Sequence, residues 1–261
     1  MTVFRHELKR GKTALIIWAV AISFMLAVCV LIYPEMSSQM GEISAMFADM
    51  GSFSQAFGMD QINFGEFIGF FGVECGNVLG IGGAFFAAIL GISALAKEEK
   101  DRTAEFLLTH PVSRTRIIAE KLCAVAAQIL LLNAVVIAVT ALSIFAIGQE
   151  VPVKTLALLF LAYLIMQLEV AAITFGISAF LNRGSLGIGL GLAAVFCFMN
   201  IISNLTEDAR FLKYITPFGY TEGADIIADT ALNGGYLAVG TAFAVVGIAL
   251  AFWQYRQKDI S

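Results

Sequence analysis

The sequence carries little charge. Only 14% of its 261 residues are charged, whereas 59% are hydrophobic. A soluble domain of this length needs far more charge to cover its surface. We therefore exclude a soluble globular protein and predict a protein that crosses a membrane several times. The formal net charge of −4 and the lack of a basic face also argue against a nucleic-acid partner.

The residues that most often ligate metals or form disulfides are scarce as well. The chain has two histidines, His6 and His110, and four cysteines. No cysteine pairs by spacing with another cysteine or with a histidine. We therefore expect the cysteines to pack as small apolar residues, and we expect neither a metal nor a cofactor. The cysteines are Cys29, Cys75, Cys123 and Cys197.

A complete phosphate-binding loop is also missing. Gly11-Lys12-Thr13 resembles the end of such a loop, but His6 stands where the first glycine is needed. We do not expect this chain to hydrolyse ATP. An intramembrane enzyme is disfavoured too, because no apolar stretch contains a histidine, paired aspartates or a zinc motif.

Long apolar runs dominate what is present. Six stretches reach the length of about 20 residues that a helix needs to cross the hydrocarbon core of a bilayer. The sequence thus predicts an all-α membrane protein with six transmembrane helices in a single domain, residues 1–261. The short basic segment 1–12 is typical of a helix that lies on the inner leaflet. The expected spans are about 13–33, 68–96, 122–147, 155–181, 185–204 and 236–255.

The basic residues predict the orientation. If the N-terminus is cytoplasmic, only Lys154, Arg210 and Lys213 of the 16 Lys and Arg lie outside. Cytoplasmic loops of membrane proteins carry the excess of Lys and Arg. Both termini are therefore predicted to be cytoplasmic.

Glycines repeat at intervals of four residues within two of the apolar stretches. Gly72, Gly76 and Gly80 lie in the second, and Gly187 and Gly191 lie in the fifth. Small residues at this spacing let two helix backbones approach closely in a membrane. We expect these faces to pack against other helices.

The longest charged segment, 94–122, separates the second and third stretches. Its pattern predicts one helix that ends before Pro111 and a second helix that Ser113 caps and that continues into the third stretch. Such a pair of helices can present a rigid surface to a soluble partner in the cytoplasm.

This segment reads E-x-x-x-T-x-E-x-L-L-x-x-P-V-S-R, and it resembles the first cytoplasmic loop of ABC-2 type transporter permeases. In that family the loop forms a coupling helix that docks on a separate ATPase subunit. The family pattern has glycine directly before the threonine, where this chain has Arg102. The residues that the resemblance assigns to coupling are Glu99, Thr103, Glu105, Leu107, Leu108, Pro111, Val112, Ser113 and Arg114.

The segment before the last span, 205–235, carries a second part of the resemblance. ABC-2 permeases have a Pro-Phe pair before a short external helix, and here Pro217 and Phe218 precede a stretch with Asp225 and Asp229. The resemblance implies an amphipathic external segment that dips into the outer leaflet and closes the pathway. It covers essentially the whole chain.

Two carboxylates lie at or inside the predicted bilayer. Glu169 is near the middle of the fourth span, and Glu74 is near the outer end of the second. A charge at the bilayer centre costs at least about 2.5–3.5 kcal/mol, so such residues are candidates for a transport pathway. Glu169 could bind an amine, carry a proton or hold Na⁺. Alternatively, it is protonated and hydrogen-bonds a neighbouring helix.

The external loop 34–67 leaves a further alternative open. Met36 and Met40 are four residues apart, as are Met46 and Met50. Thioethers bind soft cations such as Cu(I). The same pattern is typical of an amphipathic helix that rests on the outer leaflet.

The resemblance implies the permease subunit of an ABC transporter in the plasma membrane, in contact with lipid. It implies a separate ABC ATPase and either a second copy of the permease or a sister permease. The expected activity is export of a drug, a peptide or a lipid-like compound. The alternatives are a cation-extruding permease, for sodium or a copper-related function, and a membrane scaffold that transports nothing.

Overall fold

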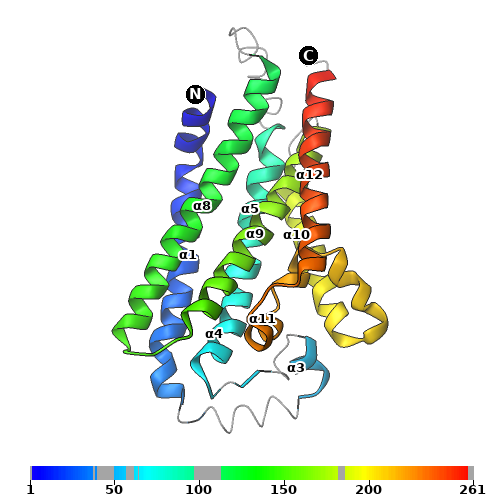
Figure 1. Ribbon diagram of the computed structural model, residues 1–261. Coiled ribbons are helices and arrows are strands. Elements are labelled where there is room, and N and C mark those ends of the chain that lie inside the picture. The colour runs from blue at the N-terminus through cyan, green and yellow to red at the C-terminus, as the bar shows by residue number, and fades with distance from the viewer. Residues whose placement is uncertain are drawn as a thin grey trace.

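The protein is a bundle of long α-helices (Figure 1). The computed structural model describes residues 2–37, 39, 50–56, 62–63, 65–96, 113–181 and 186–257. Within these ranges there is no β-strand. The elements are α1 (Thr2–Ser37), α3 (Ser52–Ala56), α4 (Phe67–Cys75), the π-helix η2 (Gly76–Ile81), α5 (Gly82–Ala94), α8 (Arg114–Ala146), α9 (Val153–Ser178), α10 (Leu186–Leu205), the 3₁₀ helices η3 (Glu207–Tyr214) and η4 (Pro217–Tyr220), α11 (Gly223–Asp229) and α12 (Gly234–Gln257).

Six segments of the described chain are long and apolar enough to cross a membrane, which confirms the predicted fold class. They are α1, the continuous run α4–η2–α5 (Phe67–Ala94), α8, α9, α10 and α12. The glycine-rich second span does not break. Instead, it widens into the π-helix η2 and then returns to α-helix.

The expectation of a separate interfacial helix at 1–12 is wrong. α1 runs without interruption from Thr2 to Ser37. Gly11 faces α8 so closely that an added Cβ would collide with the side chain of Gln128. Because the first turns of α1 pack on α8 in this way, they continue the span instead of bending onto the membrane surface.

Local sequence sets the ends of several helices. Ser113 caps α8 as predicted, since its hydroxyl oxygen accepts a hydrogen bond from the Arg116 N–H at 3.3 Å. Gly148, which follows the C-cap residue Ile147 of α8, has φ +65°, a conformation that glycine adopts without steric cost. The side chain of Asn233 accepts hydrogen bonds from the first N–H groups of α12, those of Gly235 and Tyr236, at 3.0 and 3.3 Å.

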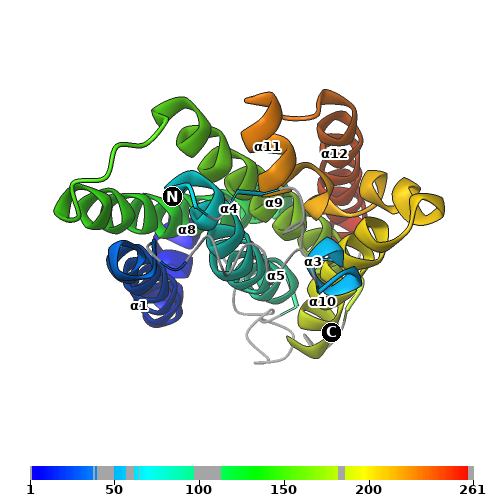
Figure 2. The same cartoon turned by 90° about the horizontal axis from the view of Figure 1, so that it is seen from below.

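α9 is the central helix. Figure 2, which looks along the bundle, shows α9 between α8 and α12 with α5 beside it, while α1 lies against α8 and α10 lies beside α5. The two chain termini lie at the same end of the bundle, and α3 and α11 lie at the other end (Figure 1). The positive-inside prediction assigns the end with the termini to the cytoplasm.

Glycines permit the closest helix contacts. An added Cβ on Gly76 or Gly80 would lie 3.0 Å from the Tyr163 ring system of α9. On Gly176 of α9 it would lie 2.6 Å from the carbonyl oxygen of Gly247 in α12. The predicted face of the second span thus packs closely, whereas Gly191 in the fifth span has no atom near its added Cβ. In lipid, close approach of this kind holds helices together through van der Waals contact.

A buried ion pair joins three helices at the end that contains the termini. Lys121 of α8 is 1% exposed. Its ammonium group donates to Glu7 Oε1 of α1 at 2.9 Å and to the carbonyl oxygen of Ala94, the last residue of α5, at 2.7 Å. The pair fixes the end of α5 relative to the start of α8.

We predict that Gly176→Ala lowers the thermal stability of the purified protein and that Gly191→Ala does not. Both changes favour a helix by about 0.5–1 kcal/mol. At Gly176 the new Cβ would collide with the backbone of α12, and overpacking costs about 1–3 kcal/mol. The melting temperatures of both variants in the same detergent test this. A Gly176→Ala protein that melts as high as Gly191→Ala would contradict the close contact.

Candidate functional site

The segment between α10 and α12 folds back into the bundle. Pro217 is the first residue of η4, and Thr216 caps this helix by accepting a hydrogen bond from the Phe218 N–H at 3.3 Å. All four residues of η4 are buried. η4 contacts α9, α10 and α12. The structure therefore places Pro217 and Phe218 inside the protein, at the end of the bundle opposite the termini.

Two hydrogen bonds from side chains hold this segment in place. The Tyr163 hydroxyl of α9 donates to the carbonyl oxygen of Thr221 at 3.0 Å. The Thr216 hydroxyl donates to the carbonyl oxygen of Phe196 in α10 at 2.8 Å. Irregular backbone is tolerated in a membrane protein where protein groups satisfy its polar atoms, and the Tyr163 hydroxyl does so for the Thr221 carbonyl. The Thr216 contact connects the segment to α10.

Tyr220, the last residue of η4, reaches Glu169. Its hydroxyl donates a hydrogen bond to Glu169 Oε2 at 2.7 Å. Burial, and then the neighbouring carboxylate, raise the pKa of the Tyr220 hydroxyl. The hydroxyl therefore keeps its proton and remains a donor. The structure thus brings Glu169 together with the segment that contains Pro217 and Phe218.

Glu169 is almost completely enclosed. It is 4% exposed, and Gly240 of α12 lies directly against its carboxylate, where any larger residue would collide. Its second oxygen, Oε1, is buried and has no hydrogen-bond partner among the described residues. A carboxylate that has one oxygen without a hydrogen-bond donor in apolar surroundings is stabilised by a proton or by a bound cation.

A cavity of about 310 Å³ lies beside Glu169, between α8, α9 and α12. Of the described residues in its wall, Glu169 is the only charged one, and the others are apolar except Thr241. The apolar residues are Leu122, Val125, Ala126, Ile165, Leu168, Ala171, Ala172, Ala244 and Ile248. The arrangement suits an apolar guest with one positive charge better than a polar solute.

Glu74 lies elsewhere. It belongs to α4, and its Oε2 accepts a hydrogen bond from the Cys29 thiol of α1 at 3.6 Å. Glu169 instead faces η4 and α12. The two carboxylates that the sequence singled out are therefore not parts of one site.

The predicted coupling residues lie mostly outside the described part of the chain. Ser113 and Arg114 are described, and Arg114 Nη1 donates to the carbonyl oxygens of Tyr255 and Arg256 at the end of α12, both at 3.4 Å. The start of α8 therefore contacts the end of the last helix. Glu99, Thr103, Glu105, Leu107, Leu108, Pro111 and Val112 are the coupling residues outside the described ranges.

Two of the four methionines of the possible Cu(I) site also lie outside the described residues. Met36 lies in the last turn of α1, where it packs against the core, and Met50 is 42% exposed. Met40 and Met46 belong to the segment that is not described. The Cu(I) alternative stays a prediction.

Sequence reasoning missed two residues of the Glu169 site. Tyr220 is three residues after Pro217, and a tyrosine in a buried apolar turn usually has a hydrogen-bond partner. That rule could have marked it as a candidate, but it does not identify a partner 51 residues away. Gly240 gives no comparable signal, because many glycines occur in the apolar stretches.

We predict that Tyr220→Phe destabilises the protein by about 1–3 kcal/mol, since it removes the donor to a buried carboxylate. Tyr214→Phe is the matched control, because Tyr214 is half-exposed and contacts Tyr236 through its ring. Thermal unfolding of the two variants in detergent measures the difference. Equal melting temperatures would show that the Tyr220 hydroxyl contributes nothing to stability.

The comparisons with known proteins agree with this architecture. A sequence search of curated proteins found no match. The family model described as "ABC-2 family transporter protein" matches residues 1–260. This match extends over all six apolar helices and the buried helix η4, and it confirms the resemblance seen in the sequence. The chain belongs to the ABC-2 family of transporter proteins.

Proposed function

We propose that this chain is the permease subunit of an ABC transporter and that it forms the translocation pathway for export across the plasma membrane. The family match over residues 1–260 is the observation that carries this proposal. ATP is hydrolysed by a separate ATPase subunit, and two permeases, identical or related, complete the transporter. A drug, a peptide or a lipid-like compound is the expected cargo.

The cytoplasmic loop couples ATP hydrolysis to the pathway in this proposal. The loop connects α5 to α8, and the buried pair of Lys121 with Glu7 and the Ala94 carbonyl joins both helices to α1 at this end. Arg114 links the start of α8 to the end of α12. A push by the ATPase on the loop therefore acts on several helices together and not on one alone.

The opposite end of the pathway is closed by the external segment. η4 is held against α9 by Tyr220 and Glu169, and α9 is the central helix that contacts α5, α8 and α12. We propose that a shift of α9 relative to α12 changes this contact and opens the outer end. Rigid helices then carry the motion from the loop to the outside.

A second candidate function is extrusion of a cation. Glu169 favours it, because its buried Oε1 has no partner among the described residues and an apolar cavity lies beside it. In this version the carboxylate pairs with sodium or with an amine during transport. A membrane scaffold is the third candidate, and it differs from the others because it needs no ATPase.

We predict that Glu105→Arg and Pro111→Ala leave folding and membrane insertion intact but uncouple ATP hydrolysis from transport. Co-expression with a candidate ABC ATPase subunit, affinity purification and ATP hydrolysis in lipid measure the effect. We expect substrate-stimulated turnover to fall by about tenfold, equivalent to ~1.4 kcal/mol.

Glu150→Arg is the matched control for Glu105→Arg, because Glu150 is an exposed acid in the link between α8 and α9, far along the chain from the coupling loop. Unchanged complex formation and turnover in Glu105→Arg would contradict the coupling role. A wild-type chain that purifies without any ATPase would favour the scaffold.

We predict that Glu169→Gln impairs transport and that Glu74→Gln does not, if the cargo carries a positive charge. Glutamine keeps an acceptor for the Tyr220 hydroxyl but removes the negative charge from the cavity. Transport by the reconstituted complex and the melting temperature of each variant separate loss of function from loss of fold. Normal transport by both variants would exclude a charge role for Glu169.

A further inference from the structure

A second carboxylate, Glu222, occupies a built site at the end of the bundle opposite the termini. It lies at the start of α11 and contributes to the walls of two hollows. The smaller, which we call the outer cavity, has a volume of about 70 Å³ and is lined by residues that include Asn77, Tyr163, Asn200 and Phe218. The other, of about 160 Å³, is polar and lies toward Lys213 and Asp225.

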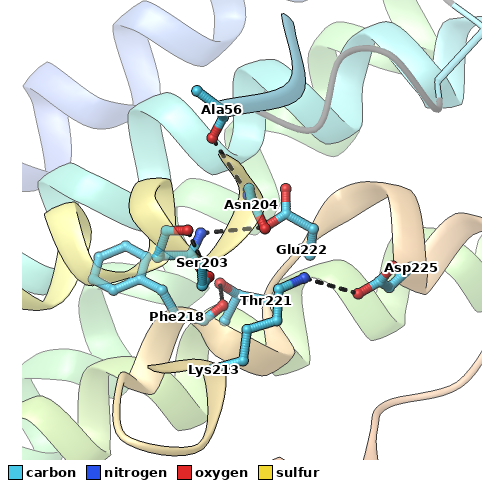
Figure 3. A network of polar contacts seen from close by, with 9 residues as sticks. Ala56, Ser203, Asn204, Lys213, Phe218, Thr221, Glu222 and Asp225 are labelled. Atoms are coloured by element: carbon cyan, nitrogen blue, oxygen red, sulfur yellow. Dashed lines mark hydrogen bonds and ion pairs between the residues drawn. The ribbon is translucent and has the colours of Figure 1, made fainter. Parts of the chain in front are cut away.

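Two amides fix the Glu222 side chain. Asn204 Nδ2 of α10 donates to Glu222 Oε2 at 3.2 Å (Figure 3). Asn200 Nδ2 of α10 donates to the same oxygen at 3.2 Å. Asn204 also donates to the carbonyl oxygen of Ala56 in α3 at 3.3 Å. Both donors bind the same oxygen, so the carboxylate is held in one orientation.

Two oxygen atoms in the wall of the outer cavity accept no hydrogen bond from the described residues. Asn200 Oδ1 is buried and has no hydrogen-bond partner among the described residues. Among the described residues, none forms a hydrogen bond or an ion pair with Glu222 Oε1. An unsatisfied buried acceptor costs about 1–3 kcal/mol, so a ligand that donates hydrogen bonds would be stabilised here.

Among the described residues, no ion pair with Glu222 is formed. Lys213 is buried nearby, but its ammonium group pairs with Asp225 at 3.6 Å (Figure 3). Arg210 and Glu207 both lie in the wall of the polar hollow, with opposite charges. Of the described residues in the wall of the outer cavity, Glu222 is the only charged one. A partly enclosed negative charge without a cation attracts one more strongly than the same charge in bulk water.

The rest of the outer cavity suits a small organic cation. Gly76, Asn77 and Ile81 of the π-helix η2 lie in the wall, and π-turns inside α-helices occur frequently at functional sites. Tyr163 and Phe218 add aromatic rings, which attract ammonium groups through cation–π interaction. The volume accommodates a charged head group with a few carbon atoms but not a whole drug or peptide.

We propose that the outer cavity binds a primary ammonium group of the transported compound, through hydrogen bonds to Glu222 Oε1 and Asn200 Oδ1. Such charge-assisted bonds are roughly twice as strong as neutral ones. The site serves as the outer binding position of the pathway. This assignment rests on the proposed permease function and extends it to a class of cargo.

Binding of ethylammonium chloride to the purified wild-type protein in detergent tests the site without any ATPase. Ligand that binds only the folded state raises Tm with its concentration. We expect ethylammonium to raise Tm in a saturable manner. Sodium and tetraethylammonium, at the same ionic strength, should not, because neither carries an N–H group. Equal stabilisation by all three cations would overturn the proposal, even if no variant could be purified.

Glu222→Gln sharpens the test. The glutamine oxygen can still accept from Asn200 and Asn204, but its amide group would replace the free carboxylate oxygen with a donor. We expect the affinity for ethylammonium to fall by about tenfold or more, because a charge-assisted hydrogen bond is lost. Glu207→Gln removes the same charge from the wall of the polar hollow and should leave the affinity unchanged.

Glu169→Gln separates this site from the cavity beside Glu169. If this change abolishes ethylammonium binding and Glu222→Gln does not, the ammonium group binds beside Glu169 and the proposal is wrong. Co-purification with the ATPase tests the permease function separately from the outer site. A stable complex whose permease shows no ethylammonium binding would reject the outer site and leave the permease function standing.

Discussion

The absence of water in the hydrocarbon core is the constraint on which the rest of this structure depends. Each backbone N–H and C=O group inside a bilayer must find a partner within the protein, so the spans are helices. The external segment meets the same requirement in another way. The Tyr163 hydroxyl of α9 donates to the Thr221 carbonyl of this segment, and the Thr216 hydroxyl of the segment donates to the Phe196 carbonyl of α10.

Polar side chains are few in the bundle, and they connect elements at specific points. Asn133 of α8 donates to Gln167 of α9 at 2.7 Å within the spans, and the contact of Glu169 with Tyr220 lies between α9 and η4. Such bonds contribute about 1 kcal/mol each in membrane proteins, so they orient the helices without locking them. A transporter needs this combination, because its helices must move relative to one another.

The two ends of the bundle differ in chemistry. At the end with the termini, the buried Lys121 joins α1, α5 and α8. At the other end, Lys213 pairs with Asp225, whereas two asparagine amides hold Glu222. Within the bundle, a tyrosine holds Glu169. A carboxylate that is held only by neutral donors can still pair with a positively charged ligand. A carboxylate in an ion pair already has its cation.

The sequence by itself determined the six spans, because the length of an apolar run is a local property. It also determined the cap at Ser113, which depends on residues three positions apart. Only the tertiary structure decided that α1 starts at Thr2, that Tyr220 meets Glu169 and that Glu222 meets α10. These contacts depend on how helices distant in the chain pack together, and no local pattern of residues specifies that packing.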